Sequence, residues 1–251
     1  MMKQMLTRLL ALIASLLMLT AWAGAESPKY TPEVEAQRLA VAAMQDKYGF
    51  TLETLGLFNP QITVAEGMAC VHFRCGFLPH SRVGEYTVLI SGSKLSIGWT
   101  YDDVDPALYQ SGDPQAPCWG VKQLEAYLAV DSGARAEWLK PFYELGEQDV
   151  HVPASMWDDL GLTRLPEEEQ KRAPVAVRAA AEEAIMDVLG LSSSWFDARL
   201  APGDSDALVS AEGRMYYTLR YPGGRDVCVH VLVDAETCQI MSITPSSGGN
   251  G

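Results

Sequence analysis

The stretch from Pro174 to Ile243 constrains the fold most, because the spacing of its apolar residues changes from helical to strand-like. Three strand-like runs, Met215–Tyr221, Val227–Val233 and Gln239–Ile243, are separated by residues of turn composition. Before them, apolar residues recur at helical spacing: Val177, Ala181, Ala184, Ile185, Val188 and Leu189. A helix with one apolar stripe and a meander with one apolar face each need cover. We therefore expect the helix to pack on the meander.

A second segment nearer the start has the same order. Thr31-Pro32-Glu33 is typical of a helix N-terminus, and Gly49 is a common helix end. Apolar residues recur at helical spacing between them: Ala36, Leu39, Ala40, Ala43, Met44 and Tyr48. Strand-like runs follow, including Tyr86–Ile90 and Lys94–Trp99, which Ser91-Gly92-Ser93 joins.

The two segments align with each other along most of their length. The helices match at an offset of 141 positions, and Glu66-Gly67 matches Glu212-Gly213 at an offset of 146. We interpret the chain as an α+β protein with two repeats of a helix packed on an antiparallel β-meander, about 70 residues each. The expected units are 26–110 and 167–245, joined by a helical insert at 111–166 and followed by a flexible tail at 246–251.

The insert has two short apolar patterns. Val121–Leu128 predicts one helix, and Trp138–Tyr143 predicts another that is bent or broken at Pro141. We expect this segment to pack across the two units. Glu167–Glu169 is interpreted as an acidic start to the second unit's helix.

Residues 1–25 predict a secretory signal peptide. Lys3 and Arg8 precede an uncharged run, and Ala23-Gly24-Ala25 has the small-x-small form of a cleavage site. The apolar run is short for a membrane span, which disfavours the alternative of an uncleaved anchor. We expect a secreted, extracytoplasmic protein with no membrane partner after cleavage.

The charge of the chain narrows its partners. Without residues 1–25 it has 17 basic and 32 acidic residues, a formal net charge of −15. Such a surface repels nucleic acid and anionic lipid, so we expect no nucleic-acid partner.

The chain has five cysteines: Cys70, Cys75, Cys118, Cys228 and Cys238. Two disulfides would leave one thiol over, and the sequence does not select a pairing.

Three short motifs resemble the PepSY-like repeats of secreted bacterial proteins. They are Tyr48-Gly49-Phe50, Leu189-Gly190-Leu191 and the segment Val229–Ile240, which contains an Asp-x-x-Thr turn. The resemblance covers both units but not residues 106–165. Cys238 stands where such repeats usually have Gly, and Ser91-Gly92-Ser93 replaces the Asp-Thr turn in the first unit.

This resemblance implies a cystatin-like fold, with each helix packed on a curved antiparallel sheet. It also implies non-catalytic binding of a protein or peptide, with a secreted peptidase or a cell-envelope component as the partner. It supplies no catalytic residues, no metal and no cofactor.

Alternation along the strands predicts which side chains are available for binding. Polar residues occupy the positions that point away from the helices. Histidine, arginine and tyrosine on such a face can hydrogen-bond a peptide or an acidic group. The candidate ligand-binding residues are His72, Arg74, Tyr216, Arg220 and His230. The alternatives are an ordinary solvated face, or a contact surface between the two units in a purely structural or assembly protein.

Two other kinds of chemistry fit the sequence less well. A thiol-dependent hydrolase would use Cys118 as nucleophile, His230 as base and Asp234 to orient the base. A zinc site would need two Cys-Val-His pairs to converge from separate units: Cys70 with His72, and Cys228 with His230. We expect neither.

Two further motifs are explained by their local structure. Ser91-Gly92-Ser93-Lys94 matches Ser-x-x-Lys but lies in a predicted turn, whereas that chemistry needs a helix start. Asp102–Pro106 offers too few oxygen ligands to hold calcium alone.

Overall fold

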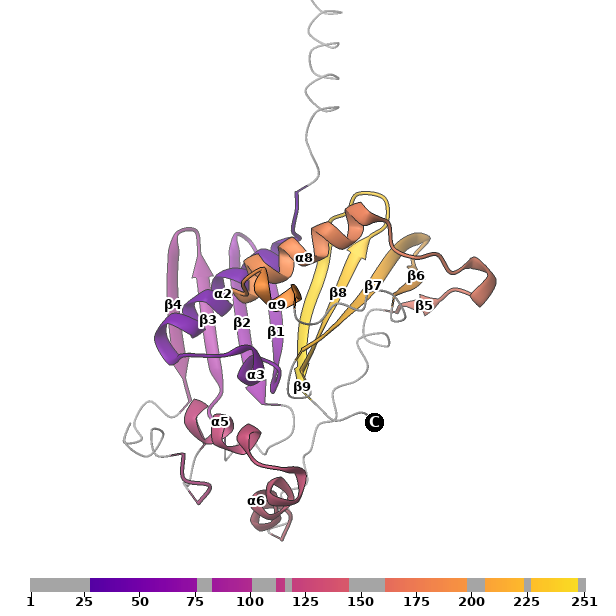
Figure 1. Ribbon diagram of the computed structural model, residues 1–251. Coiled ribbons are helices and arrows are strands. Elements are labelled where there is room, and N and C mark those ends of the chain that lie inside the picture. The colour runs from indigo at the N-terminus through magenta and orange to yellow at the C-terminus, as the bar shows by residue number, and fades with distance from the viewer. Residues whose placement is uncertain are drawn as a thin grey trace, which may run out of the picture.

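The computed structural model contains two antiparallel sheets, and the main helices lie across one side of both (Figure 1). The expected α+β class is confirmed. The residues that the structure describes are 28–75, 83–100, 112–115, 119–144, 161–197, 206–223 and 227–247. The predicted signal peptide lies outside them.

The first sheet follows helix α2 (Pro32–Tyr48) and the short helix α3 (Leu52–Leu55). Its strands pair in chain order: β1 (Phe58–Ala65), β2 (Met68–Cys75), β3 (Tyr86–Ser91) and β4 (Lys94–Trp99). The Thr31 hydroxyl accepts a hydrogen bond from the Val34 amide, and Gly49 ends α2 in the left-handed region, as the sequence predicts.

The second sheet has five strands instead of the expected three. It follows β5-β6-β7-β8-β9 order: Thr163–Arg164, Ala207–Ala211, Arg214–Pro222, Val227–Asp234 and Ile240–Ser247. Helices α8 (Val175–Leu189) and α9 (Ser194–Asp197) lie between β5 and β6 in the chain. β5 and β6 are short and carry weak strand signals, and only pairing with β7 and with each other makes them strands. β9 continues to Ser247, into the segment predicted as a flexible tail.

The two halves share details of their turns. Glu66-Gly67 between β1 and β2, and Glu212-Gly213 between β6 and β7, both have positive φ at both positions, with values of 49°, 77°, 50° and 80°. This is the backbone of a two-residue type I′ hairpin turn. Gly190, like Gly49, ends its helix in the left-handed region.

Helix boundaries around the insert differ from the sequence prediction. Glu167–Glu169 forms a separate 3-10 turn and is not the start of α8. Pro174 disfavours helical geometry in the residue before it, so α8 begins only after this proline. α5 (Val121–Ala129) is as predicted, whereas α6 (Ser132–Glu144) is one helix that runs through Pro141 without a break.

One hydrophobic core joins the two halves. α2 packs along α8, and α2 also contacts β9 of the second sheet. The Gln45 side-chain amide donates to the Leu189 carbonyl at 2.9 Å, and the Tyr30 hydroxyl donates to Asp187 at 2.8 Å. α5 packs on α3, so part of the insert covers the first half, as does the buried Trp119. Helices α2 and α8 therefore form one layer that the two sheets share.

Candidate functional site

The first sheet has one face packed on the helices and one face turned away from them, which we call the first outward face. In β2, Val71 and Phe73 are buried, with 0% and 1% of their surface exposed. Side chains alternate across a strand, so the residues between and beyond them lie on the other face. The first outward face thus carries Cys70, His72 and Arg74, as the sequence predicts.

The end of this face near Cys75 holds a polar network. The His72 Nδ1 atom is 2.9 Å from the Thr87 hydroxyl, and its Nε2 atom is 3.2 Å from a Glu85 carboxylate oxygen. Arg74 Nε lies 3.5 Å from the other oxygen of Glu85. Glu85 therefore balances part of the charge of this end and orients both predicted residues, His72 and Arg74.

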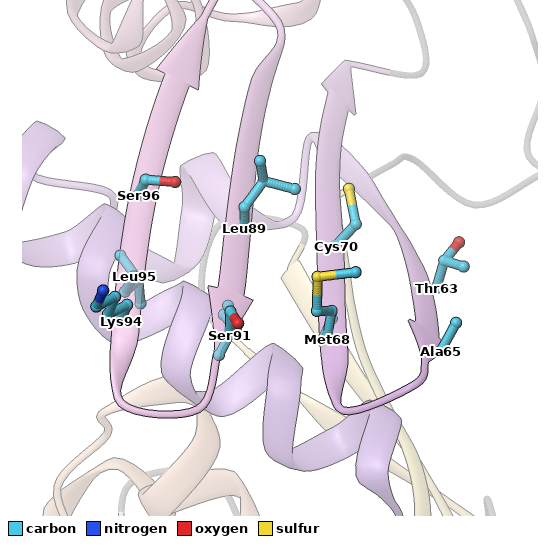
Figure 2. A pocket seen from close by; sticks show the side chains of 11 residues that line it. Thr63, Ala65, Met68, Cys70, Leu89, Ser91, Lys94, Leu95 and Ser96 are labelled. Carbon is cyan, nitrogen blue, oxygen red and sulfur yellow. The ribbon is translucent and has the colours of Figure 1, made fainter.

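The hairpin end of the same face is apolar and hollowed. Met68 and Leu89 are 57% and 53% exposed. They lie on neighbouring strands beside the half-buried Cys70 (Figure 2). The groove has a volume of about 720 Å³, and among its lining residues Lys94 alone is charged. Exposed apolar side chains that gather around a hollow are typical of an interaction surface.

The corresponding face of the second sheet, the second outward face, is largely closed. Tyr216 and Leu232 are only 8% and 4% exposed and belong to a small apolar cluster with Ala207 and Val209. Leu162 and Met241 pack against this cluster. The expectation that Tyr216 offers an accessible binding group is wrong, because β6, which the sequence did not predict, lies beside it and helps to bury its ring.

Arg220 and His230 lie at one end of the second outward face. Arg220 donates a hydrogen bond to the Cys228 sulfur at 3.1 Å and pairs across the strands with His230. Burial lowers the pKa of His230 below its ordinary value, and the nearby positive charge of Arg220 lowers it further. His230 is therefore neutral at neutral pH. The structure places the five predicted residues in two sets on separate sheets, not in one constellation.

The Asp-x-x-Thr turn between β8 and β9 is a structural device. One oxygen of Asp234 accepts hydrogen bonds from the Glu236 amide and from the amide and hydroxyl of Thr237, at 3.0, 2.8 and 2.9 Å. The other oxygen accepts from Arg214 at 2.8 Å. Burial alone would raise the pKa of Asp234, but these hydrogen bonds and Arg214 together lower it below its ordinary value. Its bonds close the turn, which leaves no free oxygen to orient His230.

The other chemical alternatives gain no support from the described residues. Within them, no group of three or more His, Cys, Asp or Glu side chains is arranged to hold a metal ion, and the two Cys-Val-His pairs belong to different sheets. Cys70, Cys228 and Cys238 form no disulfide. Ser91 and Lys94 flank a two-residue turn, as expected. Cys118 and Asp102–Pro106 lie outside the described residues.

The sequence prediction missed the apolar part of the first outward face. The same alternation that selected Cys70, His72 and Arg74 also selects Met68, and the pairing partner of Cys70 is Leu89. Alternation marks polar and apolar outward positions equally, so it also identifies Met68 and Leu89 as outward residues.

Comparison with protein-family models, with curated proteins and with solved structures finds no significant match to this chain. Of the helices in the described part of the chain, none combines the length and the apolar character that crossing a membrane requires.

Proposed function

We propose that this protein is a secreted, non-catalytic binding protein, built from two PepSY-like, cystatin-like modules, and that it binds a protein or peptide through the first outward face. A segment of a secreted peptidase or of a cell-envelope component is the partner that the resemblance favours. The observation that carries the proposal is the exposed groove around Met68 and Leu89.

Burial of this groove by a partner is energetically favourable. Met68 and Leu89 each leave more than half of their surface in water, and apolar area contributes about 25 cal/mol per Å² when it is removed from water. The adjacent His72, Arg74 and Glu85 are already held in place by their mutual contacts, so a ligand that meets them pays little entropy to order them.

The shared element order supports the modular part of the proposal. Each half has a long helix that ends at a left-handed Gly, then a short helix and two hairpins. In both halves the first of these hairpins turns at Glu-Gly with positive φ at both residues. Cys238, where PepSY-like repeats usually have Gly, has a φ of 58°, a region that favours Gly. N-terminal sequencing of the exported protein tests the secreted part, and we expect it to begin at Glu26.

The binding proposal is tested with a phage-displayed library of random peptides about 12 residues long, selected on the purified protein. The affinities of the enriched peptides are then measured by fluorescence anisotropy for the wild type and for Leu89→Glu. We expect Leu89→Glu to weaken binding about tenfold or more, because a charge replaces the centre of the apolar surface.

Val175→Glu is the matched control. Val175 is 84% exposed at the start of α8, and the substitution makes the same change of charge on another element. We expect it to alter affinity less than about twofold. The proposal fails if no peptide binds more tightly than about 100 µM, or if both variants bind the enriched peptides like the wild type.

A further inference from the structure

The outer edge of the first sheet is an exposed strand. Among the residues that the structure describes, β4 is the last strand of its sheet and pairs with β3 alone. Lys94, Leu95, Ser96 and Gly98 are exposed, and Ile97 is half-buried. An edge of this kind presents backbone amides and carbonyls to any chain that lies beside it.

The hairpin register shows which backbone groups point outward. Ser91 and Lys94 flank a two-residue turn, so they exchange hydrogen bonds with each other. The Thr100 amide donates to the Glu85 carbonyl at 3.1 Å, which agrees with this phase. Hydrogen-bonded pairs alternate along an antiparallel ladder, so the amides and carbonyls of Leu95 and Ile97 point away from β3.

The other sheet edges in the described part of the chain each carry a feature that hinders strand addition. On β9, Ile240 exchanges backbone hydrogen bonds with Lys29 and Thr31, and the Gln37 side chain donates to the Ile243 carbonyl at 2.7 Å. In β1, Pro60 occupies a position whose backbone groups point away from β2, as those of Leu95 point away from β3. Because proline has no backbone amide hydrogen, this position offers no donor at the edge. β5 is two residues long. β4 has none of these features.

The surroundings of β4 specify the chemistry of the chain that fits. Every second side chain of an added strand would lie over the groove on the first outward face. The others would lie on the opposite face of the sheet beside Leu95, which is 41% exposed. The described part of that outward face carries two basic side chains, Arg74 and Lys94, and one acidic side chain, Glu85. Its local charge is therefore less negative than that of the whole chain, which has a formal net charge of −13. Lys94 favours an acidic neighbour on the added strand.

We propose that β4 pairs with an extended segment of another protein, with apolar side chains on both of its faces and a carboxylate opposite Lys94. This inference rests on the proposed binding function and specifies its mode, which is addition of a strand to the sheet. A second copy of this chain is disfavoured as occupant because two chains with the same strong net negative charge repel one another.

The first test compares Leu95→Pro with Leu95→Ala, using the peptides enriched in the selection described above. Both variants lose the leucine side chain, but only proline also removes the outward-pointing amide, at a position where the ladder with β3 is left intact. We expect Leu95→Pro to bind about tenfold more weakly than Leu95→Ala, as for the loss of a buried hydrogen bond. Thermal unfolding of both variants shows whether they are folded.

A second test leaves the protein unchanged. Each backbone amide of the tightest enriched peptide is methylated in turn, and the affinity for the wild-type protein is measured. We expect losses of about tenfold at every second residue, because alternate amides of an added strand face β4. We also expect the peptides to contain Asp or Glu, and Lys94→Glu to weaken binding about fivefold. Lys122→Glu, an equal charge change on α5, serves as control and should leave binding unchanged.

The outcomes separate this inference from the proposed function. If Leu89→Glu abolishes binding but methylation shows no two-residue period and Leu95→Pro equals Leu95→Ala, the face binds ligand and strand addition is wrong. If no peptide is enriched, both are wrong. A concentration-dependent dimer in sedimentation equilibrium that Leu95→Pro dissociates would show a second copy at β4 and overturn the inference.

Discussion

The two halves have a similar order of elements, but their outward faces differ in exposure. Cys70, His72 and Arg74 of β2 correspond to Tyr216, Thr218 and Arg220 of β7 at the offset of 146 that aligns the hairpins. Thr218 and Tyr216 are buried in the second sheet, whereas the first sheet exposes Met68 and Leu89 and holds a groove. One element order therefore carries two different outward faces: the second is covered and stabilises the fold, and the first leaves apolar area exposed to solvent.

The difference extends to the sheet edges and the final turns. β9 is capped by Lys29–Thr31 and by Gln37, but β4 has a single neighbour in the described part of the chain. The β8–β9 turn is closed by the hydrogen bonds of Asp234, while a short turn with Gly92 at a φ of 56° joins β3 to β4. The last strand and the last turn of the second half are thus closed by hydrogen bonds that β4 and the β3–β4 turn lack in the described part of the chain.

The largest expected contrast is between Leu232→Asp and Leu89→Asp. Leu232 is 4% exposed, so a carboxylate there is desolvated without a partner and should cost about 3 kcal/mol or more of the free energy of unfolding. Leu89 is 53% exposed, and its substitution should change stability by less than about 0.5 kcal/mol. Urea unfolding measures both. If Leu232→Asp does not fold, Leu232→Ala should still cost about 2 kcal/mol. Equal losses at the two positions would remove the distinction between open and closed faces.

The two hairpin turns should differ nearly as much. Asp234→Ala leaves the amides of Glu236 and Thr237 and the Arg214 guanidinium without their acceptor, and should cost about 3 kcal/mol. Ser93→Ala in the β3–β4 turn should cost less than about 0.5 kcal/mol. Asp234→Asn keeps an acceptor oxygen but loses the ion pair, so its effect should be intermediate.

Acid titration gives an independent check on Asp234. Its pKa in the folded protein is below the ordinary 3.8, so its stabilising effect is complete above that value. The effect is lost as the pH falls from 3.8 through the folded pKa. Asp234→Ala should lack this part of the acid destabilisation, and an unchanged acid profile would contradict the assigned hydrogen bonds.

Two backbone substitutions test the turns more finely. Gly92→Ala places a side chain at a φ of 56° and should cost about 1 kcal/mol. Cys238→Gly relieves the same kind of backbone at a φ of 58° and should stabilise by about 0.5 kcal/mol, since the loss of the partly buried thiol offsets part of the gain. In thermal unfolding, we expect Gly92→Ala to lower the melting temperature and Cys238→Gly to raise it. Destabilisation by both would mean that the Cys238 side chain matters more than its backbone.

The smallest expected effect concerns His230 on the second outward face. Burial and Arg220 lower its pKa, so below the ordinary value of 6.5 the unfolded chain binds the proton more readily than the folded protein. Stability should therefore fall as the pH drops from 6.5 toward the folded pKa. His230→Asn should flatten the difference in unfolding free energy between pH 7.5 and pH 5.5, and an equally steep dependence would place the titrating group elsewhere.

The longer helices and most strands were predictable because their signals are local, whereas the four-residue helices α3 and α9 were not predicted. The Thr31 cap, the left-handed Gly49 and Gly190, and the alternation in Val227–Val233 depend on residues close together in the chain. β5 and β6 were not predictable in this way. The five residues of β6 become a strand only by pairing with β7, and the two residues of β5 only by pairing with β6.

For the candidate site, the sequence determined which side chains point away from the helices, since period-two alternation is a property of any strand. It also determined the helix ends at Gly49 and Gly190 and the strong excess of acidic residues. The tertiary structure alone decided which outward face is covered, which edge is exposed, and that Tyr216 is buried while Met68 is not. Exposure depends on what distant segments pack against a residue, and no local pattern encodes those contacts.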